Sequence, residues 1–322
     1  MSRTPALPVA AVAVALALAL AACQQPSAAP GRSPSPAPSP SATPAPSSPS
    51  PTPEPAPASA PTSTASPAPA PAPPPPAPAA GPEPAAPPAA VRPAWLGTRV
   101  LPLRADGFGE VQPTPPELVD RRLPPAAALP APPDGAFRAT IDTVPDEVVA
   151  RSTWSAACPV ALEDLRYLTL TYWGFDEQAH TGELLVAASA ADDLAGVFAR
   201  LYQARFPIED MVVTTPAELD APPTGDGGAT AAFVCRPTTG GSSWSQHAYG
   251  LAVDVNPFHN PYVRGDLVVP ELASAYTDRT WRRPGMIVAG DAVTEAFAAI
   301  GWGWGGDWRS LTDSQHFSAN GR

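Results

Sequence analysis

The distribution of proline constrains this chain more than any other feature. Of its 49 prolines, 38 precede Arg138 and 11 follow it. Residues 24–92 consist almost entirely of Pro, Ala and Ser, a composition that cannot bury enough apolar surface to offset its ordering entropy. We therefore expect a disordered, partly polyproline-like tether over residues 23–136 and one compact domain over residues 137–322. Residues 101–136 are still Pro-rich but contain scattered apolar side chains, so they either continue the tether or drape over the domain.

The N-terminus has the pattern of an export signal. Arg3 precedes an apolar run over residues 7–22 that is too short to span a bilayer and is typical of a signal-peptide core. The run ends Leu-Ala-Ala directly before Cys23, which resembles a bacterial lipobox. This resemblance implies a lipoprotein signal peptide over residues 1–22, with lipid attached to Cys23; the alternative is an ordinary signal peptide and a chance cysteine. The expected location is extracytoplasmic, lipid-anchored to the cell membrane and facing the cell wall.

The other two cysteines fit that location. With Cys23 lipidated, Cys158 and Cys235 remain as an even pair in an oxidising compartment, so a disulfide between them is predicted. Two buried thiols or two metal ligands are the alternatives, although no CxxC spacing favours metal binding.

The charge of the chain excludes several function classes. The net charge is −11, and all 19 basic residues are arginine. An acidic protein is repelled by phosphate backbones, so nucleic acid is not expected as a partner. The absence of lysine excludes Schiff-base and Ser–Lys chemistry. We expect the protein to act as a monomer.

The pattern of apolar residues predicts a mixed fold. Alternating β-branched and aromatic residues predict a strand over 166–173, paired in a hairpin with a second strand over 183–187. Ser189 has the position of an N-cap before a helix that ends at Pro207. Short strands near 211–214, 231–235 and 250–255 and a helix over 291–300 are also expected. Because these elements follow no βαβ rhythm, we expect an α+β fold with a small antiparallel sheet and packed helices.

The histidines suggest a metal site. The chain has four, namely His180, His247, His259 and His316. A catalytic zinc site needs three protein ligands and an open position. His247 lies seven residues before Asp254, a spacing that suits a loop leading into a strand. Asp313 lies three residues before His316, and a carboxylate so placed can act as a general base without binding the metal.

These residues carry a family resemblance. The pattern Ser245-x-His247-x-x-Gly250-x-Ala252-x-Asp254, followed by Asp313-x-x-His316, resembles the zinc D-alanyl-D-alanine carboxypeptidase and peptidoglycan endopeptidase family, the VanY-like group. The stretches YWGF, TGEL, AFVCR and NPFHNPYV, at residues 172–175, 181–184, 232–236 and 256–263, are similar to segments of the same family.

The resemblance implies a fold, a cofactor and residue roles. The fold is the zinc domain shared by DD-peptidases and Hedgehog-type signalling domains. Arg236 would face the substrate's terminal carboxylate or the developing oxyanion, and Ser245 would either orient the loop of His247 or only cap it. Asp313 would be the general base. The zinc ligands would be His247, Asp254 and His316.

The implied activity is zinc-dependent hydrolysis of peptide bonds in the peptidoglycan stem peptide, of the D-Ala-D-Ala carboxypeptidase type. The first alternative is an endopeptidase acting on an L-Ala-D-Glu-type bond, since Asp at the base position is common in that branch. The second is a non-catalytic, zinc-stabilised lipoprotein that binds the cell wall.

The roles of several other residues have two possible interpretations. His259 is either a structural residue or a fourth ligand, and His180 is expected on the surface or in a turn. Three tryptophans near the end either line a substrate cleft or pack in the core, namely Trp302, Trp304 and Trp308.

Overall fold

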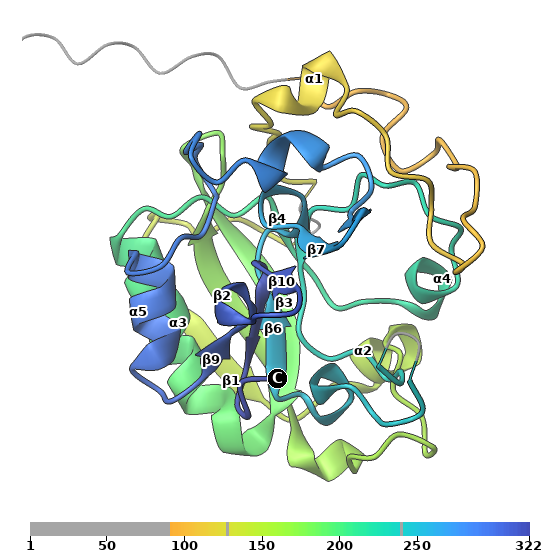
Figure 1. Ribbon diagram of the computed structural model, residues 1–322. Helices are drawn as coiled ribbons and strands as arrows, with labels where there is room; N and C mark the ends of the chain where they lie inside the picture. The colour runs from red at the N-terminus through yellow and green to blue at the C-terminus, as the bar shows by residue number, and fades with distance from the viewer. Residues whose placement is uncertain (1–90, 127–128, 239–240) are drawn as a thin grey trace, which may run out of the picture. The chain divides into compact units, whose positions relative to one another are not determined.

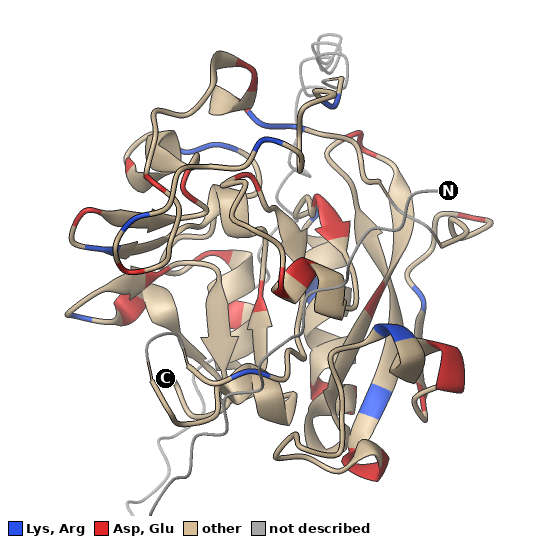
Figure 2. Cartoon of the chain, turned by 90° about the vertical axis from the view of Figure 1, so that its right-hand side faces the viewer, with Lys and Arg blue, Asp and Glu red and all other residues tan. Residues whose placement is uncertain are grey.

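The computed structural model describes residues 91–126, 129–238 and 241–322 (Figure 1). The predicted signal peptide, Cys23 and the first part of the predicted tether lie outside the described residues. Within the described ranges, no helix combines the length and the apolar character needed to cross a membrane. Acidic residues occur in many separate helices, strands and loops (Figure 2).

The central hairpin is formed by β2 (Leu165–Trp173) and β3 (Ala179–Ala187), which confirms the predicted pair of strands. They pair antiparallel along their whole length, and β1 (Ala139–Asp142) pairs with the outer edge of β2. The second half of β3 is buried on both faces because its side chains alternate between two apolar clusters. Leu184 faces the helices, whereas Leu185 packs on the other side of the sheet with Phe233.

Two helices, α3 (Ala191–Gln203) and α5 (Ala292–Ala298), pack against the first of these clusters (Figure 1). The buried side chains of α3 recur at helical spacing, at Leu194, Val197, Phe198 and Leu201. The predicted cap is wrong, because Ser189 lies in a 3-10 turn (Ala188–Ala190) and the helix follows Ala190 without a side-chain cap.

Short strands complete the fold. One antiparallel sheet has the order β6-β11-β9, from Ala252–Asp254, His316–Ser318 and Gly303–Trp304. Another has the order β10-β7-β8, from Thr312–Asp313, Tyr262–Arg264 and Leu267–Val269. The strands predicted near 211–214 and 231–235 are shorter and begin earlier, as the parallel pair β4 (Asp210–Met211) and β5 (Ala229–Thr230). The architecture is α+β with small antiparallel sheets, as predicted.

The remaining helices are short. They are α1 (Pro116–Val119), α2 (Asp146–Arg151) and α4 (Pro216–Leu219). A capping box at Thr215 and Glu218 begins α4, whereas Asp291 caps α5 by accepting the N–H groups of Val293 and Thr294.

Residues 91–126, here called the N-terminal segment, belong to the compact domain. Leu118 and Leu123 are fully buried, in a cluster with Phe258 and Tyr276. The structure therefore moves the predicted boundary at residue 137 towards the N-terminus. The sequence did not predict this burial, because the leucines between the prolines of this segment follow neither a helical nor a strand period.

A buried ion pair ties this segment to the domain. The Arg121 guanidinium donates two hydrogen bonds of 2.7 Å to the Glu209 carboxylate, and both side chains are about 1% exposed. Burial alone would raise the pKa of Glu209, but the Arg121 guanidinium lowers it below its usual value. Removing either partner would leave an uncompensated buried charge, which is strongly destabilising.

Cys158 and Cys235 form a disulfide with a Cα–Cα distance of 5.8 Å. It joins the segment before β2 to the loop that carries Arg236, 77 residues later in sequence. Such a long closed loop restricts the unfolded chain, which in the chain-entropy account stabilises the fold by about 4.5 kcal/mol.

His259 makes the stability of the domain depend on pH. The ring is fully buried, stacks on Phe175 at 4.7 Å and donates from Nε2 to the Arg121 carbonyl. Burial lowers its pKa from 6.5 to about 4. Between these values the unfolded chain binds a proton that the folded chain does not. The contribution of His259 to the free energy of unfolding therefore falls, by about 1.4 kcal/mol per pH unit as the pH is lowered.

We predict that His259→Gln makes the free energy of unfolding less dependent on pH between about pH 6.5 and pH 4. Urea unfolding of both proteins across this range measures the two slopes, and a comparison above pH 7 isolates the packing lost with the ring. Parallel slopes for the two proteins would contradict the assignment.

Candidate metal centre

The loop before β6 aims His247 into a cavity. Ser245 precedes a 3-10 turn (Gln246–Tyr249), and its hydroxyl accepts the N–H of His247. The turn ends at Gly250 with a φ of 67°, in the left-handed region. A Cβ at Gly250 would lie 2.5 Å from the backbone nitrogen of Ala187, whose N–H donates to the Gly250 carbonyl. Glycine is therefore required where this loop docks on β3.

Strand pairing brings the other two predicted ligands to the same place. Asp254 on β6 lies directly opposite His316 on β11. His316 Nδ1 is 3.0 Å from Asp254 Oδ1, and His247 Nε2 is 3.3 Å from Asp254 Oδ2. Together the three side chains offer ligand atoms that all lie within 4.8 Å of one another.

In the neutral tautomers that their outward hydrogen bonds favour, the two histidines have no proton on the nitrogens that face each other. His247 Nδ1 donates to the Ala232 carbonyl at 2.5 Å, and His316 Nε2 lies 3.3 Å from the carbonyl of Arg322. The remaining nitrogens are 3.2 Å apart and point towards each other and Asp254. Two lone pairs and a carboxylate that face one another require a shared cation.

The spacing of these three groups fits a metal ion. Tetrahedral zinc with bonds of about 2.0–2.1 Å separates its ligand atoms by about 3.3 Å. The two histidine nitrogens lie 3.2 Å apart, and one ligand atom from each of the three side chains lies within 4.8 Å of the others. Without a metal, a proton supplies part of the charge: burial would lower the pKa of His316, but its hydrogen bond to Asp254 raises it. Burial likewise favours protonated Asp254, but His247 and His316 hold its pKa well below the usual range.

Asp313 lies beside this group without belonging to it. The residue is on β10, opposite Tyr262, and a Cβ at Gly305 would lie 2.5 Å from its carbonyl oxygen. Burial, reinforced by the charge of Asp254, raises the pKa of Asp313 to about 7. Its Oδ1 atom is buried and has no hydrogen-bond partner among the described residues, so it has a lone pair to accept a proton from a molecule bound in the cavity.

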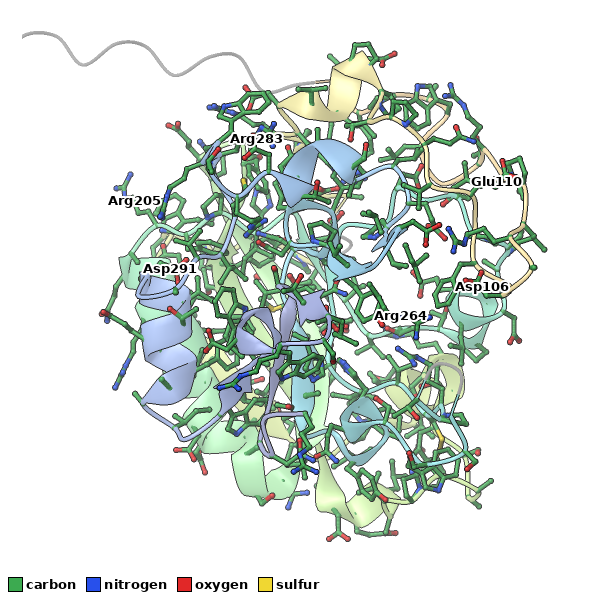
Figure 3. The ribbon with its side chains drawn as sticks, viewed as in Figure 1. Asp106, Glu110, Arg205, Arg264, Arg283 and Asp291 are labelled. Atoms are coloured by element: carbon green, nitrogen blue, oxygen red, sulfur yellow. A yellow bond between two sulfur atoms is a disulfide. The ribbon has the colours of Figure 1, made fainter. Side chains whose placement is uncertain are left out.

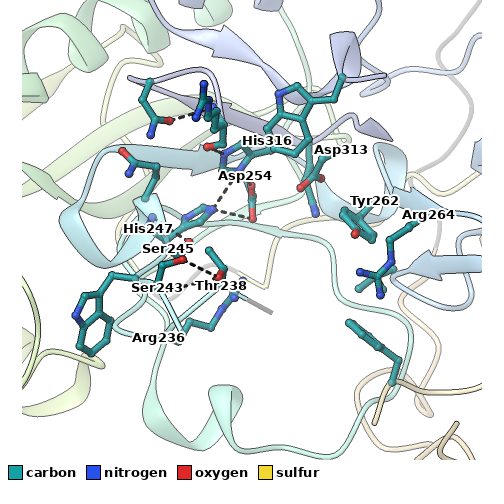
Figure 4. A pocket seen from close by; sticks show the side chains of 18 residues that line it. Arg236, Thr238, Ser243, Ser245, His247, Asp254, Tyr262, Arg264, Asp313 and His316 are labelled. Carbon is teal, nitrogen blue, oxygen red and sulfur yellow. Dashed lines mark hydrogen bonds and ion pairs between the residues drawn. The ribbon is translucent and has the colours of Figure 1, made fainter. Parts of the chain in front are cut away.

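The three predicted ligands and Asp313 line one cavity of about 410 Å³ (Figure 4). Arg236 also lines it, with Nη1 donating to the carbonyl of Pro237, so the structure brings every predicted catalytic and metal-binding residue to this cavity. Tyr262, Arg264 and Phe108 line it as well. Sequence reasoning missed these three because no pattern distinguishes them from surface residues.

The remaining candidates lie elsewhere. His259 is not part of the metal group. His180 lies within β3, paired with Tyr172, and is half-buried with Nε2 3.0 Å from Asp176, so the prediction of a surface or turn residue is wrong. Of the tryptophans, Trp302 is buried in the core, Trp304 packs at its edge and Trp308 lines the cavity, 5.4 Å from the His316 ring.

Comparison with protein families gives one match. Residues 239–319, about a quarter of the chain, match the family described as D-alanyl-D-alanine carboxypeptidase. Searches of curated proteins and of solved structures found no match. The matched region contains the whole metal group and Asp313, and it supports a peptidase of this family type.

We predict that the purified protein binds one equivalent of zinc, and that His247→Ala, Asp254→Ala and His316→Ala each lose it. Elemental analysis after dialysis measures the content, and zinc should raise the melting temperature of the original protein but not of these variants. His180→Ala is the matched control and should retain the metal. Full zinc content in the His316→Ala protein would contradict the ligand set.

Proposed function

We propose that the domain is a zinc peptidase that hydrolyses peptide bonds in the peptidoglycan stem peptide, with the D-Ala-D-Ala carboxypeptidase type as the first candidate. The observation that carries the proposal is the position of Asp313. A buried carboxylate that does not bind the metal, but shares a cavity with three metal ligands, suits a general base.

The residues divide the chemistry between them. A zinc ion held by His247, Asp254 and His316 would polarise the scissile carbonyl and lower the pKa of the attacking water. Asp313 would accept a proton from that water and deliver it to the leaving amine. Arg236 would neutralise the substrate's terminal carboxylate or the developing oxyanion.

The endopeptidase alternative has support of its own. Arg236 and Arg264 lie on opposite sides of the cavity (Figure 4), an arrangement that suits a peptide extending past the metal group in both directions. The non-catalytic alternative is less favoured, since a binding module needs no buried carboxylate beside its zinc.

The proposed setting follows from the N-terminus. Lipid on Cys23 and the Pro-rich tether would hold a monomeric domain at the membrane surface, within reach of the cell wall. The disulfide between Cys158 and Cys235 supports an oxidising compartment.

We predict that Asp313→Ala retains zinc but lowers kcat by about 10²- to 10⁴-fold, the usual contribution of a general base. His316→Ala should lose both zinc and activity. Asp307→Asn, an exposed carboxylate of the same segment, is the control and should retain full activity. Full activity of the purified Asp313→Ala protein would contradict the assignment of Asp313 as the general base.

Digestion of purified muropeptides, with and without a chelator, identifies the peptide bond that the protein cleaves. We expect the loss of one alanine from pentapeptide stems by mass spectrometry, abolished by the chelator. Cleavage within the stem would establish the endopeptidase instead, and unaltered muropeptides with zinc-loaded protein would favour the binding module.

A further inference from the structure

Arginine side chains cluster around the cavity, although the net charge of the chain is −11. Three of the described residues that line it are arginines, Arg236, Arg264 and Arg322. The carboxylates of the described lining are Asp254 and Asp313, and both are assigned to the metal group and the general base. With a bound divalent cation the lining would carry a net positive charge, which attracts anionic ligands into a cleft.

The guanidiniums of Arg264 and Arg322 have no part in the proposed hydrolysis, and Arg264 is the one that lies across the cavity from Arg236 (Figure 4). It ends β7, the strand whose Tyr262 pairs with Asp313. Figure 4 shows Arg264 and Arg236 on opposite sides of the cavity, with Asp254 and Asp313 along the edge between them. A ligand that touches both guanidiniums must therefore extend across the metal group.

The N-terminal segment keeps the nearby acids away from Arg264. Arg104 donates two hydrogen bonds of 3.2 Å to Asp266, in the β7–β8 turn, and three of 3.2–3.4 Å to Asp106. Among the residues that the structure describes, no carboxylate lies within 4.0 Å of the Arg264 guanidinium. In Figure 3 Arg264 lies beside the loop that carries Asp106, so its charge faces the cavity without a counterion from that loop.

The same loop supplies an apolar wall. Phe108 follows Asp106 and lines the cavity together with Arg264 and Tyr262. The position of the loop is fixed, because Gly109 donates its N–H to the buried Glu271 carboxylate at 2.8 Å and a Cβ at Gly109 would lie 2.9 Å from it. An aromatic ring beside a guanidinium suits a side chain with an aliphatic stem and a carboxylate end.

We propose that Arg264 binds an internal carboxylate of the peptide substrate, on the opposite side of the metal group from Arg236. The substrate is then an acidic peptide, recognised by carboxylates at two separated positions. This inference rests on the proposed peptidase function for its kinetic test, but not for its binding test.

The kinetic test compares two stem peptides, one with free internal carboxylates and one with the same groups amidated. We expect the original protein to prefer the free acid by about 10- to 100-fold in kcat/KM, the usual effect of a hydrogen bond to a charged group. Arg264→Gln should abolish this preference, so that the two peptides have equal kcat/KM values. Arg200→Gln, which removes an exposed arginine on α3 and changes the net charge equally, should keep the preference.

A binding test separates the proposed role of Arg264 from the proposed peptidase function. Calorimetric titration of both peptides, in the presence of a chelator that blocks turnover, should show tighter binding of the free acid by the original protein and equal binding by Arg264→Gln. If neither peptide is cut but this difference holds, the peptidase function fails and the role of Arg264 stands. If Arg264→Gln retains the preference, or weakens both peptides equally, the role of Arg264 is overturned.

Discussion

The candidate site depends on the pairing of β6 with β11. These strands come from parts of the chain 62 residues apart, and their register places Asp254 opposite His316. Side chains alternate between the faces of a strand, so a slip of one residue would turn one ligand away from the cavity. Phe317 and Val253, adjacent in the same pairing, are fully buried in the core. The apolar core thus fixes the register, and the register fixes the metal group.

The two histidines show how backbone groups prepare a metal site. The outward nitrogen of each ring donates a hydrogen bond to a main-chain carbonyl, and the inward nitrogen of the neutral ring is therefore an acceptor. Those carbonyls belong to Ala232 and Arg322, which lie outside the ligand motifs. Zinc affinity in this fold should therefore be sensitive to backbone position in segments that supply no ligand side chain.

The sequence predicted the local elements better than their tertiary setting. The β2–β3 hairpin was predictable because alternation over nine residues is a strong signal, and the metal ligands because histidine is scarce and their spacing resembles a known family. The sequence left open whether the N-terminal segment drapes over the domain or continues the tether, since Leu118 and Leu123 become core residues only through contact with Phe258 and Tyr276. Arg264 also escaped notice because its role depends on which neighbouring acids Arg104 engages.

The docking of the N-terminal segment also limits how the protein can be divided for experiments. A fragment that starts at residue 137 would retain every metal ligand, yet it would leave Glu209 buried without Arg121 and remove the Phe108 wall of the cavity. The shorter region matched by the family would also lose the hairpin on which Gly250 docks. A fragment suitable for crystallisation or enzymology should therefore include Arg92, which donates to Asp210 at 2.9 Å from well inside the region that its proline content would have led one to discard.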